Sequence, residues 1–181
     1  KYKEKIKISK FKNNINKSAQ LKKFIYEKKI THLINFAGLS RVKCDEKKNQ
    51  CLKSNYKAIK GIINNLNKLK NKPFFIFVST CHVYKYSKNK LKENGKTDPR
   101  SLYAKLKLKS ENYVKKNYKN YAIIRLFNVY GPHQPNNFFI PDIKDKILNN
   151  KTIEIDKSVR DFIHVDEVSR IIKFILNKNL K

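Results

Sequence analysis

A tyrosine and a lysine four residues apart, Tyr103 and Lys107, are the side chains in this sequence best suited to proton transfer. On a helix this spacing puts the phenol and the ammonium on one face, one turn apart. A free tyrosine has a pKa near ~10, and a neighbouring lysine cation favours its ionised form. Thr80 supplies a hydroxyl that can orient a substrate alcohol or carbonyl against the phenol. Together the three side chains predict a site for interconverting an alcohol and a ketone.

The Tyr-x-x-x-Lys spacing carries little weight by itself, because the chain has ten tyrosines and is rich in lysine. The same spacing occurs at Tyr56/Lys60, Tyr84/Lys88 and Tyr86/Lys90. The segments around Tyr103 must therefore distinguish it from the others.

Two neighbouring segments are predicted to position these side chains. Residues 74–80 are five apolar residues followed by Ser79 and Thr80, a pattern typical of a strand buried on both faces. Residues 98–101, Asp-Pro-Arg-Ser, are a turn and helix-start signal, so a helix carrying Tyr103 follows. Thr80 then lies at the C-terminal end of a strand, which is where parallel α/β sheets bind ligands.

The rest of the chain alternates between strand and helix patterns. We expect an edge strand over 5–9, a helix capped by Ser18 that buries Leu21, Phe24 and Ile25, a strand over 30–38 and a helix over about 52–70. Later segments predict a buried strand over 121–127, a turn at 128–132, a helix near 141–149, a strand over 152–155, a strand-like run over 160–165 and a last helix from Asp166. This alternation predicts a parallel α/β sheet.

The formal net charge of +29 raises the question of nucleic-acid binding. The excess is almost wholly lysine, with arginine only at positions 41, 100, 125, 160 and 170, and it is spread along the chain. Readers of phosphates and bases usually rely on arginine for its bidentate fork. We therefore expect no specific nucleic-acid partner, although a basic nucleic-acid-binding module stays open as an alternative function.

Cysteine and hydropathy patterns bear on the compartment. Cys44, Cys51 and Cys81 are an odd set with no C-x-x-C, a pattern that fits a reducing cytoplasm and argues against a disulfide framework or a zinc site. No apolar run is long enough to span a membrane. We expect a cytoplasmic protein with neither a membrane partner nor a bound metal.

Five segments in one order resemble the extended short-chain dehydrogenase/reductase family of nucleotide-sugar epimerases, dehydratases and reductases. These segments are Asn35-Phe36-Ala37-Gly38, Ser79-Thr80-Cys81-His82-Val83-Tyr84, Tyr103-x-x-x-Lys107 with Glu111, Arg125-Leu126-Phe127-Asn128-Val129-Tyr130-Gly131-Pro132 and Arg160-Asp161-Phe162-Ile163-His164-Val165. The resemblance covers roughly residues 30 to 177. It implies a Rossmann-like, doubly wound parallel sheet, NAD or NADP as cofactor, a nucleotide-diphosphate sugar as substrate and a homodimer.

The resemblance also implies roles for individual residues. Thr80 takes the place of the catalytic Ser/Thr, Tyr103 that of the acid/base, and Lys107 that of the residue that holds the nicotinamide ribose and tunes the tyrosine. Further residues match positions beside the cofactor: Phe36, Ala37, Gly38, Asn55, Ser79, Leu126 and Phe127. Asn128 and Arg160 match residues that hold the sugar diphosphate, and a guanidinium binds phosphate bidentately.

Simpler interpretations of these residues stay open. Asn128 could cap the turn before Pro132, and Arg160 could form a local surface ion pair with Asp161. His164 lies in an apolar run and could be a core histidine. The whole domain could also be a non-catalytic, Rossmann-like binding domain, although an intact Thr80, Tyr103 and Lys107 argue against that.

The sequence departs from the family pattern at its start. The family opens with a Gly-rich turn that cradles the cofactor pyrophosphate, whereas glycine occurs here only at positions 38, 61, 95 and 131. We therefore expect residues 1–181 to be an N-terminally truncated fragment: a partial NAD(P)-binding domain that lacks the first strand–helix–strand unit. The start of the substrate-binding lobe is expected in about 132–165, and the fragment alone is expected to be inactive.

The positions after Thr80 favour some reactions of the family over others. Its 4,6-dehydratases carry an acidic pair directly after the catalytic threonine, and here those positions are Cys81 and His82. The resemblance therefore favours hydride transfer at a sugar carbon by a 4-epimerase or a 4-keto reductase. It does not separate these two.

Overall fold

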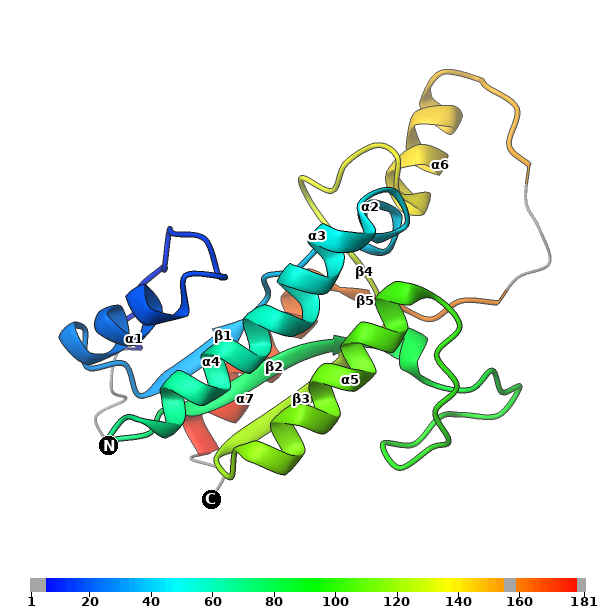
Figure 1. Ribbon diagram of the computed structural model, residues 1–181. Coiled ribbons are helices and arrows are strands. Elements are labelled where there is room, and N and C mark those ends of the chain that lie inside the picture. The colour runs from blue at the N-terminus through cyan, green and yellow to red at the C-terminus, as the bar shows by residue number, and fades with distance from the viewer. Residues whose placement is uncertain (1–5, 155–158, 179–181) are drawn as a thin grey trace. The chain divides into compact units, whose positions relative to one another are not determined.

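The computed structural model describes residues 6–154 and 159–178, which divide after Arg125 into two compact units (Figure 1). Along the chain, the first unit contains α1 (Ser18–Glu27), β1 (His32–Asn35), α2 (Arg41–Glu46), α3 (Lys48–Leu52), a π-helical turn η1 (Lys53–Lys57), α4 (Ala58–Asn67), β2 (Phe74–Thr80), a 3-10 turn η2 (Cys81–Val83), α5 (Leu102–Asn117) and all of β3 (Tyr121–Leu126) except its last residue. The predicted alternation of strand and helix is confirmed.

Strands β1, β2 and β3 form one sheet in that order, with β2 in the centre. β1 pairs with β2 in parallel, with Asn35 opposite Phe77, so the C-terminal ends of both strands reach the same edge. The predicted parallel α/β sheet is therefore confirmed. β3 is an outer strand, and its residues are only half-buried where the sequence predicted a buried strand.

Helices α4 and α5 pack on one face of this sheet, and α1 packs on α4 (Figure 1). The main apolar core lies between them and unites ten buried side chains: Leu21, Ile25, Ile59, Ile62, Ile63, Leu66, Phe75, Phe77, Val114 and Tyr118. Burial of such side chains is the dominant favourable term in folding. Strand β2 is thereby fixed along its whole length against the helix that carries Tyr103.

The two elements predicted to position the site form as expected. β2 spans Phe74–Thr80, the predicted range. Ser101 caps α5, because its hydroxyl accepts a hydrogen bond from the backbone N–H of Ala104 at 3.2 Å. An N-cap of this kind satisfies one of the donors left free in the first helical turn.

Other local predictions need correction. Residues 6–9 form no strand, and Ile8 is largely exposed because no neighbouring strand pairs with this segment among the described residues; Lys5 lies outside them. Ser18 is the first residue of α1 and not its cap, and its hydroxyl accepts a hydrogen bond from Asn65 at 3.0 Å. The helix predicted over 52–70 begins earlier, at Lys48, and contains the π-helical turn η1.

The structure also corrects the expectation about cysteines. Cys44 and Cys51 form a disulfide with their Cα atoms 5.0 Å apart, and both are fully buried. In one continuous helix, residues seven apart would lie about 10 Å apart. The break at Lys47, which has φ −127° and ψ 62° and separates α2 from α3, brings the two cysteines close enough to bond. Leu106 and Tyr103 of α5 pack against this pair, so the disulfide borders the predicted site.

The second unit contains β4 (Asn128–Tyr130), α6 (Phe139–Leu148), β5 (Phe162–His164) and α7 (Val165–Lys178). β4 pairs with β5 in parallel, so the turn predicted at 128–132 is in part a strand. Residues 152–154 form no strand, and Ile155 lies outside the described residues. None of the helices in the described ranges is both long enough and apolar enough to cross a lipid bilayer.

Candidate active site

Thr80 and Tyr103 meet where β2 ends and α5 begins. The hydroxyl of Thr80, the last residue of β2, lies close enough to the phenol of Tyr103, in the first turn of α5, to lower the pKa of that phenol through hydrogen bonding. The same Thr80 oxygen accepts the backbone N–H of His82 at 3.3 Å, which fixes the threonine side chain at the start of η2. The structure thus brings together the two side chains that the sequence predicted to handle the reacting oxygen.

Lys107 lies one turn further along α5 and is almost completely buried. Its ammonium donates a hydrogen bond to the Val78 carbonyl at 2.8 Å and lies 4.9 Å from the centre of the Phe77 ring and 6.0 Å from that of Tyr103. Burial lowers the pKa of Lys107 to about 8, and the nearby Glu111 partly opposes this shift. Below pH 8 the lysine is therefore mostly a cation beneath the tyrosine.

The pKa of Tyr103 shifts in the direction opposite to the sequence expectation. Burial raises the pKa of the Tyr103 phenol, the hydrogen bond from Thr80 opposes this, and Cys81 adds to the increase. The expectation considered the lysine charge alone, whereas removing the phenol from water disfavours its ionised form. In the protein by itself Tyr103 is therefore a neutral proton donor at neutral pH.

Asn55 holds the loop that follows β1 and is itself fully buried in η1. Its side-chain oxygen accepts the Leu39 N–H at 2.7 Å, and its amide donates to the Leu39 carbonyl at 2.9 Å. Gly38 has φ +153°, and a Cβ at this position would lie 2.8 Å from the Asn55 oxygen. Only glycine fits there, so the predicted cofactor segment Phe36–Gly38 is anchored by Asn55 while its residues remain exposed.

Asn35 is the last residue of β1 and Ser79 the next-to-last residue of β2, and both are buried. The Asn35 oxygen accepts the Ala37 N–H at 3.2 Å, while its buried Nδ2 has no hydrogen-bond partner. Ser79 donates its hydroxyl to the carboxylate of Glu111 at 2.5 Å, so its backbone is the part left for the predicted cofactor contact. Sequence reasoning assigned no role to Asn35 or Glu111, although a glutamate four residues after Lys107 lies on the same helical face.

The groups at this sheet edge suit the nicotinamide-ribose end of a dinucleotide. Lys107 has three N–H donors, of which the Val78 carbonyl takes one, and Asn35 offers a further unpaired donor. The sequence contains no Gly-rich turn for the pyrophosphate. The residues present therefore fit one end of such a cofactor.

The other predicted site residues belong to the second unit. Leu126, Phe127 and Asn128 are half-buried, and the Asn128 amide donates to the Asp161 carbonyl at 2.9 Å. Arg160 is exposed, with its guanidinium 5.6 Å from the centre of the Phe139 ring. His164 is not a core histidine, because it is partly exposed and accepts the Asp166 N–H at 3.3 Å.

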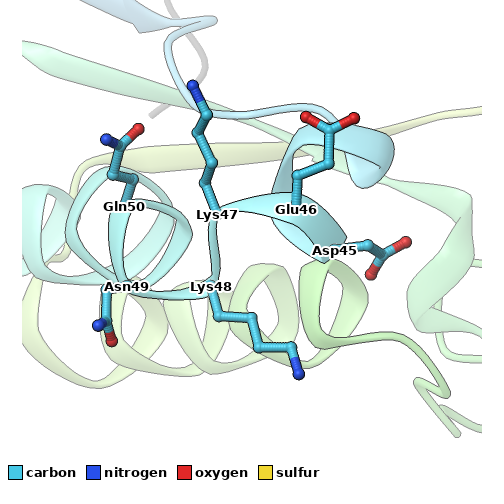
Figure 2. Close-up of a pocket in the computed structure, with 6 residues that line it drawn as sticks. All are labelled: Asp45, Glu46, Lys47, Lys48, Asn49 and Gln50. Atoms are coloured by element: carbon cyan, nitrogen blue, oxygen red, sulfur yellow. The ribbon is translucent and has the colours of Figure 1, made fainter.

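A surface hollow at the α2–α3 junction is unrelated to this chemistry. Six consecutive exposed residues, Asp45 to Gln50, line it. Figure 2 shows their side chains pointing in several directions, without converging on a common point. The hollow is a feature of the junction between two short helices and includes neither Thr80 nor Tyr103.

Comparison with known families decides the classification. The sequence pattern of the NAD dependent epimerase/dehydratase family matches residues 2–181. The chain belongs to this family. This confirms the resemblance drawn from the motifs, and NAD is the cofactor that the family description names.

Curated relatives of this NAD dependent epimerase/dehydratase family member are named as dehydratases. This chain is 28% identical to a dTDP-D-glucose 4,6-dehydratase of Dictyostelium discoideum, over 93% of this chain and 43% of that protein. It is 32% identical to the dTDP-D-glucose 4,6-dehydratase of Homo sapiens over 58% of this chain and 32% of that protein. The chain thus spans less than half the length of these relatives.

Solved structures of the same fold include 4-epimerases. The UDP-glucuronic acid 4-epimerase of Bacillus cereus, solved with UDP-glucuronic acid and NAD, matches with a TM-score of 0.77 and 23% identity over 91% of this chain and 54% of that one. The UDP-N-acetylglucosamine 4-epimerase of Methanobrevibacter ruminantium, solved with UDP-N-acetylmuramic acid, matches with a TM-score of 0.76 and 28% identity over 88% and 55%. The predicted Rossmann-like fold is confirmed. The reaction type is not narrowed, because the matching proteins include dehydratases as well as 4-epimerases.

Proposed function

We propose that this protein is an NAD(P)-dependent enzyme that modifies a nucleotide-diphosphate sugar by hydride transfer at a sugar carbon, as a 4-epimerase or a 4-keto reductase. The observation that carries the proposal is the group of Thr80, Tyr103 and Lys107 at the end of β2 and the start of α5. A hydroxyl, a phenol and a buried ammonium in this order are suited to moving the proton of a sugar hydroxyl.

Each of the three side chains has a distinct task in this proposal. The phenolic oxygen of Tyr103 gives a proton to the reacting sugar oxygen or takes one from it, and the Thr80 hydroxyl holds that oxygen in line. Lys107 stabilises the phenolate by its charge when Tyr103 has lost its proton. The nicotinamide ring, when bound, supplies or accepts the hydride.

Cofactor and diphosphate binding are assigned to the residues that match these positions in the family. We assign contacts with the nicotinamide end to Lys107, the Phe36–Gly38 segment, the Ser79 backbone and Asn55 of the first unit, and to Leu126 and Phe127 of the second. Arg160 and Asn128 are assigned to the diphosphate of the nucleotide sugar, because a guanidinium and an amide donate hydrogen bonds to phosphate oxygens. Uridine diphosphate sugars are the first candidates to test, since the solved structures of similar fold are named as acting on them.

Elimination of water is the reaction that the site supports least. Cys81 is half-buried and His82 is exposed directly after Thr80, and neither side chain is a carboxylate. The buried carboxylate nearby, Glu111, is hydrogen-bonded to Arg125 and Ser79. This supports epimerase or reductase chemistry, and the dehydratase names of the curated relatives make that reaction an outcome to be measured.

The test uses the full gene product, purified and analysed for bound dinucleotide. Retained NAD(P) that is not consumed while a UDP-sugar is converted to its C4 epimer would establish an epimerase. Oxidation of NAD(P)H only when a 4-keto nucleotide sugar is added would establish a reductase. Formation of a 4-keto-6-deoxy product would overturn the assignment in favour of a dehydratase, and no turnover together with no dinucleotide binding would remove the enzymatic function.

A further inference from the structure

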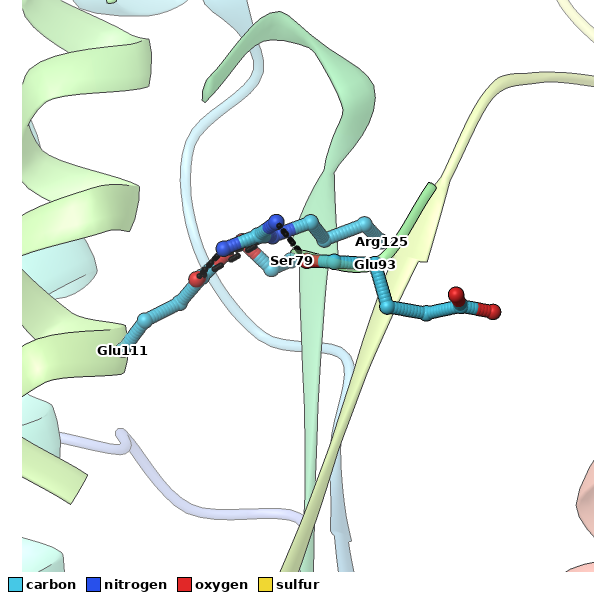
Figure 3. A network of polar contacts seen from close by, with 4 residues as sticks. All are labelled: Ser79, Glu93, Glu111 and Arg125. Carbon is cyan, nitrogen blue, oxygen red and sulfur yellow. Dashed lines mark hydrogen bonds and ion pairs between the residues drawn. The ribbon is translucent and has the colours of Figure 1, made fainter. Parts of the chain in front are cut away.

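Glu111 is the one fully buried carboxylate among the described residues, and it lies on the same face of α5 as Tyr103 and Lys107. An ionised carboxylate without solvent is costly to bury unless hydrogen bonds and an opposite charge compensate it. Glu111 has both. Figure 3 shows its carboxylate meeting the hydroxyl of Ser79 and the guanidinium of Arg125.

The contacts of this carboxylate are several and short. Arg125 donates from Nε to Oε1 at 3.1 Å and to Oε2 at 3.2 Å, and from Nη2 to Oε2 at 2.6 Å, while Ser79 donates to Oε1 at 2.5 Å. Arg125 is held in turn by the Glu93 carbonyl, which accepts from Nη1 at 3.0 Å, and by the Tyr84 ring 4.5 Å away. In Figure 3 the carboxylate of Glu93 points away from the network. Charge-assisted hydrogen bonds of this kind are geometrically specific.

The network joins the two elements that carry Thr80, Tyr103 and Lys107 to β3 and to the loop after η2. Glu111 belongs to α5, Ser79 and its neighbour Thr80 to β2, and Arg125 to β3, while Tyr84 and Glu93 belong to the loop after η2. Glu111 of α5 is hydrogen-bonded to Ser79, the residue directly before Thr80 in β2. This bond fixes the position of α5 along the axis of β2. That register sets whether the phenol of Tyr103 meets the hydroxyl of Thr80.

The network also sets the charge beside Lys107. On α5 the ionisable neighbours of Lys107 are Tyr103 and Glu111, and β2 presents the Phe77 ring and the Val78 carbonyl. β3 contributes Arg125, which binds Glu111, and η2 contributes Cys81, which acts on Tyr103. Tyr56 and the bonded Cys44 and Cys51 pack with Leu106 and Tyr103 on the side of α5 that faces α2 and η1. The carboxylate of Glu111 raises the pKa of Lys107, and the Arg125 guanidinium bound to that carboxylate brings the formal charge of the pair to zero.

We propose that Glu111 and Arg125 are positioning residues of the candidate active site, which fix the register of α5 on β2 and keep the net charge next to Lys107 close to neutral. Their part in catalysis rests on the proposed function, whereas their effect on Lys107 does not. A purely structural role explains the pair less well, because replacing a buried ion pair by apolar residues is often neutral or stabilising.

The test compares two single variants that remove opposite charges. Glu111→Gln leaves Arg125 as an uncompensated cation, which disfavours both protonated Lys107 and neutral Tyr103, so the pH dependence of activity moves down by about one pH unit. Arg125→Met leaves the Glu111 carboxylate without its counter-charge, and the pH profile of activity moves to higher pH. A structural defect would move both profiles in the same direction or neither.

The titration of Lys107, followed by NMR on isotope-labelled lysine, gives a readout that needs no substrate. The Lys107 signal is identified by its loss in Lys107→Arg, and its midpoint is expected to fall in Glu111→Gln and to rise in Arg125→Met. If the full gene product turns over no nucleotide sugar but these opposite shifts occur, the proposed function fails and the charge effect stands. Midpoints that do not move in two folded variants would overturn the inference.

A double variant, Glu111→Leu with Arg125→Met, covers the case in which a single variant does not fold. It removes the buried charges together, so we expect it to fold, to shift the Lys107 midpoint less than either single change, and to lower kcat at least tenfold because Ser79 loses its acceptor. The matched control is Glu27→Gln, which breaks an exposed ion pair with Lys23 on α1 and should change nothing. Full activity with an unshifted profile in the double variant would show that the pair has no positioning role.

Discussion

The two units differ in how they hold polar side chains. All the buried polar side chains of the described residues lie in the first unit, and they include Asn55, Ser79, Thr80, Lys107 and Glu111. In the second unit Val168 is the one buried residue among those described, and α6 buries none. Of the proposed catalytic groups, Thr80 and Lys107 are thus fixed in a packed interior and Tyr103 is half-buried. The groups proposed for the substrate diphosphate are less enclosed, since Asn128 is half-buried at the start of β4 and Arg160 is exposed before β5.

This difference predicts where substitutions will act. A buried polar group is held by few and specific partners, so that its loss changes geometry and charge together. A half-exposed group that contacts a ligand can be removed without unfolding, and the loss appears in binding. Changes in the first unit should therefore affect rate and stability, and changes in the second unit should affect substrate affinity.

The largest expected effect is on the rate of catalysis. Tyr103→Phe removes the proposed proton donor but keeps the ring, so kcat of the full gene product should fall by about 10³-fold or more, with little change in bound dinucleotide. Arg160→Leu is the matched change in the second unit and should mainly raise KM for the nucleotide sugar. Steady-state kinetics on both variants decide the matter, and a Tyr103→Phe enzyme of normal kcat would remove Tyr103 from the mechanism.

The elements that position this tyrosine were predictable because their signals are local. The apolar run of residues 74–78 and the Pro99–Ser101 helix start depend only on neighbours in sequence, and both formed as expected. The direction of the Tyr103 pKa was not predictable, because burial depends on the packing of the disulfide-bonded pair and Leu106 around the ring. Proximity of a lysine is visible in a sequence, whereas loss of solvent is not.

The partners of Glu111 show the same limit. Its spacing from Lys107 places it on the correct face of α5, yet pairing with Ser79 and Arg125 depends on the order of β2 and β3 in the sheet. The Cys44–Cys51 disulfide was missed because the expectation relied on a C-x-x-C pattern and on the compartment, whereas the bond depends on the break between α2 and α3 at Lys47. Contacts between residues on different elements depend on how those elements are placed against one another, and the composition of a sequence does not give that placement.

A second prediction compares one aromatic residue in each unit. Phe75 is fully buried in the core of β2, and Phe75→Ala should lower the free energy of unfolding by about 4 kcal/mol through lost burial and a cavity. Phe139 on α6 is 42% exposed and stacks on Phe162, so Phe139→Ala should cost about 1 kcal/mol or less. Urea unfolding followed by circular dichroism measures both, and equal losses would contradict the contrast between the units.

The smallest effect concerns the pH dependence of stability and again compares one lysine from each unit. Burial lowers the pKa of Lys107 to about 8 in the folded protein, from 10.5. Below pH 8 this lysine is charged in both states, and burying its charge opposes folding. Between pH 8 and 10 the unfolded chain binds more protons at this position, so the free energy of unfolding rises with pH, by on the order of 1 kcal/mol per pH unit.

To isolate the contribution of Lys107, the free energy of unfolding of a Lys107→Met variant is subtracted from that of the unmodified protein at each pH. The contributions of the other lysines then cancel, because they titrate in both proteins. The matched control is Lys146→Met on α6, because Lys146 is exposed and its ion pair with Asp142 raises its pKa. Because the pKa of Lys146 is raised, the stability that its ion pair contributes is lost only above about pH 10.5. The difference in the free energy of unfolding between the unmodified protein and Lys146→Met should therefore stay flat from pH 8 to 10. A flat difference for Lys107 as well would mean that its ammonium is not held in a dry interior, and the contrast between the two units would then not extend to the candidate active site.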